Sequence, residues 1–304
     1  MPSLKAIRKR IVSVKSMEKI TRAMKMVAGA RLNRAQQRIL AMRAYAVKTH
    51  EVLERCTARQ EGADGSVAAP AHPLLVQRPE KSVLMLVLTS DRGLCGAFNA
   101  NICKRAEREW HEREGRGQKV QLALVGRKAR DYFRRRHAPV FHEFQGVWDK
   151  LDLDTARIVA KTLLAPFLAA EIDAIYLVYN EFKSAMTQRV VVESLLPVIN
   201  DDNVLDFTEP EEHKHYCIDE FIFEPDRTAL LERLVPMYVE ISVLRSLYES
   251  SASEHGARMT AMDTATKNAK DMIDSLTLQY NRARQASITK ELLEIVGGAE
   301  ALKG

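Results

Sequence analysis

The sequence predicts an α/β protein: a long antiparallel coiled coil of N- and C-terminal helices plus a central Rossmann-like α/β domain. Residues 4–60 and 237–296 each contain no proline and a single glycine, which favours one long helix at either end of the chain. Between them, β-rich runs alternate with helical stretches, as in a parallel sheet covered by helices. A content of 46% hydrophobic but only 6% aromatic residues suits long helices and excludes disorder of the whole chain.

The N-terminal segment has the heptad spacing of a coiled coil, in which apolar positions recur at alternating steps of four and three. These positions are Ala28, Leu32, Ala35, Ile39, Met42, Ala46, Thr49 and Leu53, after a more closely stepped apolar stripe of Leu4, Ile7, Ile11, Val14, Met17, Ile20, Met24 and Val27. The C-terminal segment keeps nearly the same rhythm from Ile241 to Ala283. Because small or polar residues such as Thr49 and Thr266 hold several positions, we expect a weakly packed seam between the two helices.

A helix of about sixty residues spans roughly 90 Å, at a rise of about 1.5 Å per residue. A compact chain of this length is only about 50 Å across. We therefore expect both ends to project from the central domain and to pair antiparallel. In the alternative, each segment breaks at its glycine, Gly29 or Gly256, and the ends form a compact bundle. A single glycine costs a helix only about 1 kcal/mol.

The chain divides into four predicted parts. They are an N-terminal coiled-coil helix over 1–60, a linker over 61–81, a central α/β domain over 82–226 and a C-terminal coiled-coil helix over 227–304. The linker mixes Gly, Ala and Pro without periodicity. Within the central domain we expect strands over 83–89, 120–125, 174–180 and 190–196, and helices over 98–112, 127–136 and 154–171.

The first strand is followed by the loop S-D-R-G-L-C-G-A-F-N, residues 90–99, at a strand-to-helix turn. Gly93 and Gly96 allow such a turn to cradle a phosphate, but the G-x-G-x-x-G and G-x-x-x-x-G-K-[ST] spacings of nucleotide-binding loops are absent from the chain. We therefore interpret the loop as a structural turn. No His is placed to activate Cys95, which favours a buried free thiol over a nucleophile.

Two clusters resemble metal ligands. His213, His215 and Cys217 would share one face of a strand, but no fourth ligand accompanies them. The acidic run of residues 201–212 lacks the spacing of a calcium-binding EF-hand. We interpret both clusters as parts of solvated loops. We therefore expect no metal site, no cofactor and no catalytic residue on this chain.

Positive charge is concentrated at the N-terminus. Residues 1–50 hold thirteen Lys or Arg and one acid, a net charge of +12, whereas the remaining 254 residues carry −6. Such a segment attracts a polyanion: nucleic acid, a membrane surface or an acidic protein face. The chain contains no apolar run long enough to span a membrane, and its four scattered cysteines suit reduced thiols.

Three motifs together resemble the gamma subunit of F-type ATP synthase. They are S-M-E-K-I-T-R-A-M-K-M-V-A-G-A-R-L-N-R-A-Q at residues 16–36, the loop at 90–99, and A-R-M-T-A-M-D-T-A-T-K-N-A followed by Y-N-R-A-R-Q-A-S-I-T-K-E-L-L-E-I-V-G-G-A at residues 280–299. The resemblance covers essentially the whole chain, in the expected order. It departs at residues 61–81 and at Gly29, where the family more often has Ala.

The resemblance implies a rotor shaft rather than an enzyme. The terminal helices would turn inside a ring of alpha and beta subunits while the α/β domain rests as a foot on a proteolipid ring, so that proton flow is coupled mechanically to ATP synthesis or hydrolysis. It also implies an epsilon (or equivalent) subunit, membrane contact only through the complex, and no nucleic acid. The expected location is peripheral on the cytoplasmic face of the bacterial inner membrane, or alternatively the matrix face of the mitochondrial one.

The resemblance also assigns roles to residues. The catalytic-ring bearing and catch would comprise Arg284, Gln285, Ile288, Thr289, Leu292, Leu293, Ile295 and Val296. The basic shaft face would comprise Lys5, Arg8, Lys9, Lys19, Arg22 and Lys25, and the foot would meet the proteolipid ring through Arg43, Tyr45, Phe223 and Glu224.

Two other functions fit the sequence. A nucleic-acid-binding coiled coil would use the basic segment, although Tyr45 is the only aromatic residue in the first fifty available to stack on bases. A nucleotide-using α/β enzyme with helical arms would require the chain to bind a nucleotide.

Overall fold

The computed structural model describes residues 3–57, 72–198 and 226–301. They form two compact units, each treated separately below. A helical unit contains Met1–Ala30 and Arg258–Gly304, and an α/β unit contains Arg31–Ala257. The metal-like residues 201–217, and the foot residues Phe223 and Glu224, lie outside the described residues.

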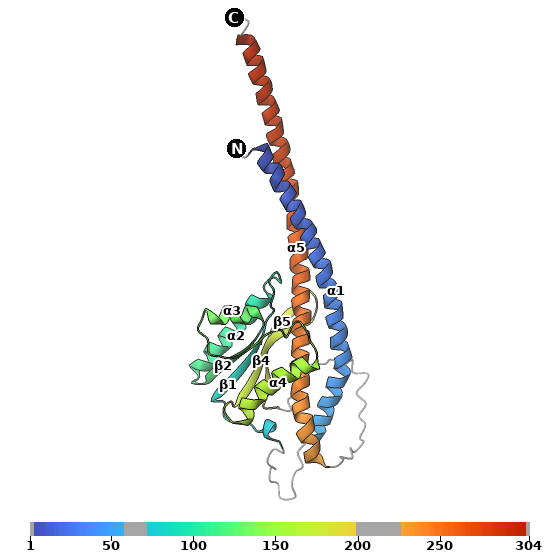
Figure 1. Ribbon diagram of the computed structural model, residues 1–304, viewed down its shortest axis with the longest axis vertical. Coiled ribbons are helices and arrows are strands. Elements are labelled where there is room, and N and C mark those ends of the chain that lie inside the picture. Colours follow the sequence, from blue (N-terminus) through green and yellow to red (C-terminus); the bar gives the residue numbers. More distant parts are fainter. Residues whose placement is uncertain (1–2, 58–71, 199–225, 302–304) are drawn as a thin grey trace. The chain divides into compact units, whose positions relative to one another are not determined.

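Two long helices run through both units. Helix α1 spans Leu4–Thr57 and α5 spans Arg227–Ala301, and each continues without interruption through its glycine, Gly29 or Gly256 (Figure 1). The compact-bundle alternative is therefore wrong. The cost of one glycine is small compared with the cooperative gain of extending a helix on both sides of it.

The helical unit is a coiled coil with a thin seam. Helix α5 contributes the expected rhythm of buried or half-buried positions: Met262, Thr266, Ala269, Ile273 and Leu276. Helix α1 differs from expectation, because Met17, Ile20 and Val27 are exposed by 53% or more. Its buried positions are Ile7, Val14, Thr21 and Ala28, seven residues apart, so a polar Thr21 occupies the seam in place of its apolar neighbours.

The α/β unit contains a five-stranded sheet in the order β3-β2-β1-β4-β5. Its strands are β1 (Ser82–Leu88), β2 (Lys119–Val125), β3 (Val140–Phe144), β4 (Ala174–Phe182) and β5 (Gln188–Leu196). The first four are parallel, and β5 pairs antiparallel with β4. The four predicted strands are confirmed, whereas β3 was not predicted.

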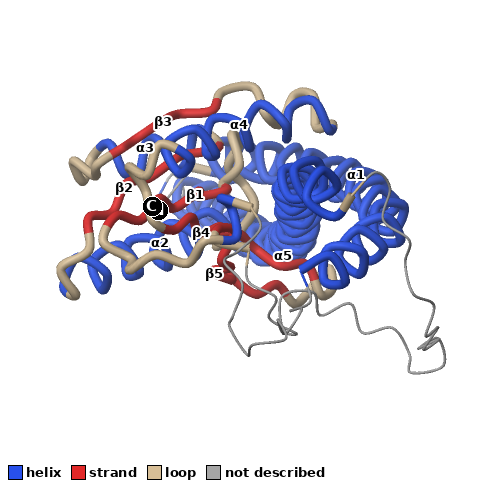
Figure 2. The backbone as a smooth tube through the Cα atoms, turned by 90° about the horizontal axis from the view of Figure 1, so that it is seen from below, coloured by secondary structure: helices blue, strands red, loops and turns tan. Residues whose placement is uncertain are grey.

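Helices cover both faces of the sheet, on opposite sides of it in Figure 2. On one face, α2 (Phe98–Gly115) and α3 (Arg127–Arg134) pack against Val83, Met85 and Val87 of β1. On the other face, α4 (Leu153–Leu168) and the neighbouring parts of α1 and α5 pack with Leu84, Leu86 and Leu88. Because β1 is buried on both faces, it reads as a continuous apolar run rather than an alternating one.

Candidate interaction surfaces and the family of the chain

The C-terminal end of α5 exposes an apolar tip. It comprises Ile288, Leu292, Leu293, Ile295 and Val296, whose exposed fractions run from 49% to 68%. The three residues predicted to form the catch, Arg284, Gln285 and Thr289, are also exposed on this end of the helix. A cluster of exposed large apolar side chains is the usual mark of a surface that another protein covers.

The basic face is solvent-exposed in five of its six residues, and Lys25 is half-buried. Two of the six are paired. Arg22 contacts Glu18 at 2.6 Å one turn away, and Lys25 crosses to Asp263 of α5 at 2.6 Å. Among the described residues, Lys5, Arg8, Lys9 and Lys19 form no ion pair, so their charge remains available to a partner.

Asp263 joins the two helices of the helical unit. Its carboxylate accepts from Lys25 at 2.6 Å and pairs with Lys267 at 3.1 Å. The ammonium groups of these two lysines lower the pKa of Asp263 below its usual value. Because the side chains of Lys25 and Asp263 remain 44% and 34% exposed, we expect this contact to fix the register of the seam more than it stabilises it.

The structure describes part of the predicted foot. Tyr45 is 53% exposed, and its hydroxyl donates to the Sδ atom of Met237 on α5 at 3.2 Å. Arg43 lies within α1, but its side chain is outside what the structure describes. Of the four predicted foot residues, the structure describes the side chain of Tyr45 alone.

The loop at residues 90–99 is held by side chains rather than arranged around a phosphate. Asn99 Oδ1 accepts from the backbone N–H of Ser90 at 3.0 Å, and Asn99 Nδ2 contacts Cys95 Sγ at 3.1 Å. Cys95 is 1% exposed, which agrees with a buried thiol. Leu94 adopts φ 63° and is 63% exposed, so the loop presents an apolar side chain outward.

A hollow of about 350 Å³ opens at the carboxyl ends of β2 and β3. It is lined by Asp91, Gly126, Arg127, Arg130, Glu143, Phe144, Gly146 and Asp149, together with Leu124 and Gln145. Asp91 Oδ1 accepts from the backbone N–H of Arg127 at 2.9 Å, which fixes the first turn of α3. Sequence reasoning missed this hollow because its lining comes from three separate segments: Asp91, residues 124–130 and residues 143–149.

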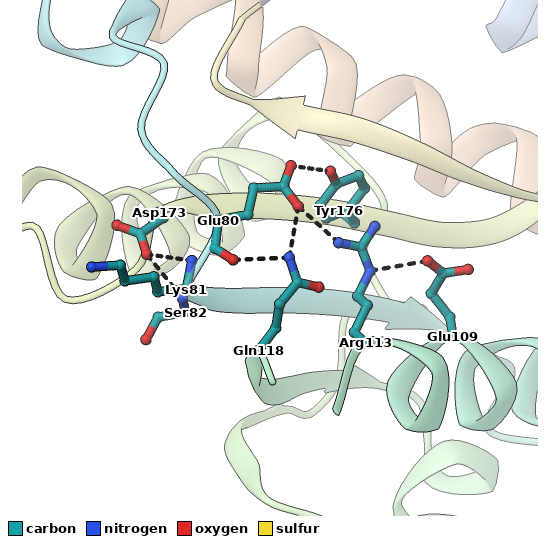
Figure 3. Close-up of polar contacts among 8 residues, drawn as sticks. All are labelled: Glu80, Lys81, Ser82, Glu109, Arg113, Gln118, Asp173 and Tyr176. Carbon is teal, nitrogen blue, oxygen red and sulfur yellow. Dashed lines mark hydrogen bonds and ion pairs between the residues drawn. The ribbon is translucent and has the colours of Figure 1, made fainter. Parts of the chain in front are cut away.

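Sequence reasoning also missed a charged network at the amino end of β1 (Figure 3). Glu80 accepts from Arg113 of α2 at 3.0 Å and from the hydroxyl of Tyr176 of β4 at 2.6 Å. The guanidinium of Arg113 stacks over the Tyr176 ring, 3.9 Å from its centroid, and also donates to Glu109 at 2.9 Å. These contacts tie the segment before β1 to one helix and one strand.

A second charged cluster is buried between the sheet and α5. Arg245 of α5 donates to Glu193 of β5, and Glu193 also accepts from the hydroxyl of Tyr179 of β4 at 2.6 Å. Glu249 lies one turn beyond Arg245, with 4.0 Å between Arg245 Nε and its carboxylate. Burial raises the pKa of Glu249 to about 7, although Arg245 opposes the shift.

Among the described residues, no group of three metal-ligating side chains gathers. None of the described helices has a stretch that could pass through a bilayer.

Comparison with known proteins gives full-length matches. The family model described as ATP synthase matches residues 3–302. The ATP synthase gamma chain of Sorangium cellulosum (strain So ce56) is 62% identical over 323 residues, and that of Anaeromyxobacter sp. (strain Fw109-5) is 52% identical over 303; both alignments cover all of each chain.

Solved structures share the fold. A chain of the Euglena gracilis mitochondrial ATP synthase, in an OSCP/F1/c-ring structure, matches with a TM-score of 0.67 at 20% identity, over 98% of this chain and 94% of that one. A chain of the Tetrahymena thermophila mitochondrial ATP synthase central stalk and c-ring matches with a TM-score of 0.57 at 24% identity, over 81% and 99%. With its full-length match to the family model and to curated gamma chains, the chain belongs to the ATP synthase gamma-chain family.

Proposed function

We propose that this chain is the central rotor shaft of an F-type ATP synthase. It would couple proton flow through a proteolipid ring to ATP synthesis or hydrolysis in a ring of alpha and beta subunits. The observation that carries the proposal is the full-length match to gamma chains, together with helices that leave apolar and basic surfaces exposed. A shaft that turns inside a ring of subunits requires such exposed surfaces.

The proposed mechanism is mechanical. A shaft without three-fold symmetry touches three catalytic subunits differently at each angle, and these differential contacts shift each site among states of different affinity for ADP, phosphate and ATP. The chain performs no bond chemistry in this scheme. Its own contribution is the free-energy difference between contacts made in one orientation and those made in the next.

The apolar tip would turn in a hydrophobic bearing, with Arg284, Gln285 and Thr289 as a polar catch for a beta subunit. An apolar bearing suits rotation because dispersion and hydrophobic contacts are non-directional. The basic face would lie opposite acidic loops of the catalytic subunits. Attraction between exposed charges changes gradually with lateral position, so it holds a surface close without locking it.

The foot would meet the proteolipid ring through Arg43, Tyr45, Phe223 and Glu224, with an epsilon or equivalent subunit beside it. The chain would then be peripheral, on the cytoplasmic face of a bacterial inner membrane, in line with the bacterial sources of its gamma-chain relatives. Its membrane contact would come only through the complex.

The composition of the complex tests this proposal. The complex would be purified from its own membranes through a tag on this chain and weighed by native mass spectrometry. We expect one copy of the chain with three each of two nucleotide-binding subunits and a ring of small proteolipids. Recovery of the chain as a homo-oligomer, or bound to nucleic acid without those subunits, would contradict the proposal.

The bearing role has its own test. Deleting residues 288–304 should lower ATP synthesis in membrane vesicles while leaving the α/β unit folded, because the side chains of residues 288–298 are exposed and contribute little to the core. Deleting only residues 302–304 is the matched control. Synthesis rates equal to the control would show that the apolar tip is not a bearing.

A further inference from the structure

Helix α3 presents a strongly basic surface to solvent. Residues 127–136 contain six Lys or Arg and one acid, Asp131. The inner face of the helix is held by Ala129 and Phe133, which are both 0% exposed and pack in the core against β1 and α2. Arg136 is held to Glu107 of α2, which also accepts from the hydroxyl of Tyr132 at 2.7 Å. The remaining cations therefore point away from the core.

Three of these cations form one line along the helix. Arg127, Arg130 and Arg134 follow steps of three and four, the spacing that places side chains on one helical face. We call these three residues the arginine stripe. Lys128 and Arg135 lie beside it, and both are exposed.

Little of this charge is neutralised within the chain. Among the described residues, Arg130 pairs with Asp131 at 3.2 Å, whereas the side chains of Arg127 and Arg134, and of neighbouring Lys128 and Arg135, form no ion pair. Four like charges on two adjacent helical turns repel one another. A bound anionic partner would relieve that repulsion, so the surface is built to bind rather than to stabilise the helix.

The shape of the surface distinguishes a protein from a lipid partner. Arg127 and Arg130 also line the 350 Å³ hollow, whose lining includes Glu143 and Asp149 as well. A membrane is a laterally uniform anionic plane, and it would press phosphates against these two carboxylates as well as against the arginines. A protein surface can oppose carboxylates to the stripe and place other groups opposite the acids.

The spacing indicates the secondary structure of the partner. Steps of three and four residues along α3 separate the stripe residues by about 5 Å. Acidic residues one turn apart on a helix have the same separation, whereas same-face residues of a strand lie roughly 6.6 Å apart. We propose that the arginine stripe of α3 docks an acidic helical segment of another protein, with Glu or Asp at i, i+3 and i+7.

This inference goes beyond the shaft proposal and does not depend on it. It concerns the outer face of the α/β unit, not the coiled coil. Binding can be measured on the isolated full chain, so its failure leaves the shaft proposal untouched, and failure of the shaft proposal leaves the docking surface standing.

The first experiment measures binding of a fluorescent helical peptide to the full chain by anisotropy. The peptide carries Glu at i, i+3 and i+7 on one face, and a second peptide of identical composition distributes the same residues around the helix. The stripe variant is Arg127→Gln with Arg130→Gln and Arg134→Gln. The control variant, Lys119→Gln with Lys161→Gln and Arg233→Gln, removes equal charge from other exposed positions.

We expect the stripe variant to bind the one-faced peptide about tenfold more weakly than the wild type, and the control variant to change binding by no more than about twofold. The dispersed peptide should bind the wild type more weakly than the one-faced peptide. Circular dichroism should show all three proteins equally folded, because the substituted side chains are exposed or half-exposed. Equal loss in both variants, or equal binding of both peptides, would overturn the proposal.

A second experiment uses the assembled complex. Lys128 supplies an amine beside the stripe, so a carbodiimide should form an amide between it and a contacting carboxylate. We expect a cross-link from Lys128 to an acidic helical peptide of another subunit, absent in Lys128→Gln. Vesicles of phosphatidylglycerol that bind the wild type but not the stripe variant, with no such cross-link, would assign the surface to lipid and overturn the protein partner.

Discussion

Thr21 of α1 and Thr266 of α5 meet inside the seam of the helical unit, with 2.8 Å between their hydroxyl oxygens. They are 9% and 8% exposed. Thr21 also donates to the carbonyl of Glu18 at 3.0 Å, within its own helix. Because this contact between the two hydroxyls forms in one register of α1 against α5 only, the pair favours that register over its neighbours.

Thr266→Val should lower the free energy of unfolding of the helical unit by about 1 kcal/mol, because it removes a buried hydrogen bond while nearly preserving volume. The double variant Thr21→Val with Thr266→Val should cost less than the sum of the two single variants, since the contact between the two hydroxyls can be lost only once. Urea unfolding of the four proteins measures this coupling. Strict additivity would show that the two hydroxyls do not act as a pair.

Gly126→Ala should destabilise the α/β unit by at least about 2 kcal/mol more than Gly117→Ala. Both glycines have positive φ, 92° and 82°, so both variants incur backbone strain. A Cβ at Gly126 would lie 2.2 Å from the Thr89 carbonyl oxygen, whereas one at Gly117 meets nothing within 4 Å. Equal losses in urea unfolding would mean that Thr89 moves aside without cost.

Arg113→Met should cost about 2 kcal/mol of stability, because it removes charged hydrogen bonds to Glu109 and Glu80, leaves the buried Glu109 paired with Arg105 alone and releases Glu80 from α2. Arg108→Met on the same helix is the control, since Arg108 is exposed and should change stability by less than about 0.5 kcal/mol. Thermal unfolding of the two variants compares them directly. A loss of stability in Arg113→Met no larger than that in Arg108→Met would show that the network contributes no stability.

Glu249 should make stability depend on pH. Its pKa is raised to about 7 from 4.5, so between these values the folded state holds a proton that the unfolded state has lost. Stability contributed by this group is present below about pH 4.5 and falls as the pH rises to about 7. Glu249→Gln should flatten that decline in urea titrations. A slope identical to that of the wild type would assign the pH dependence to other groups.

The unpaired part of the basic face should matter for coupling and not for stability. Arg8→Gln with Lys9→Gln and Lys19→Gln removes three exposed charges without breaking an ion pair among the described residues. Unfolding should change by less than about 0.5 kcal/mol, whereas ATP-driven proton pumping in vesicles should fall and lose part of its salt sensitivity. Pumping equal to that of the Lys119, Lys161 and Arg233 control would remove this face from the proposed contact.

Much of the fold follows from local patterns. The buried strands were predicted because each is a compact apolar run, and the long helices because breakers are missing. Strand β3 was missed because four of its five residues are exposed, so V-F-H-E-F shows neither a buried run nor a clean alternation. The seam positions predicted on α1 were partly wrong, because Met17 and Ile20 were assigned to the seam for their apolar side chains. The buried positions instead recur every seven residues, which places Thr21 inside the seam.

The charged clusters had no comparable signal. Glu80, Arg113 and Tyr176 come from three separate segments, and only the folded sheet brings them together. The arginine stripe is different, because its spacing is visible in R-K-A-R-D-Y-F-R-R-R. What the sequence alone did not indicate is which of these cations the fold leaves unpaired.

The exposed apolar tip also bears on the life of the chain before assembly. Leu293 and Ile295 are 67% and 68% exposed in the isolated chain, on a helix end that nothing else in the described structure covers. Chaperones and proteases recognise such segments, and they act continuously on proteins that present them. We therefore expect a copy that is not assembled into a complex to be degraded from this end. Degradation of the unassembled copies would then adjust the amount of this chain to the number of catalytic rings available for assembly.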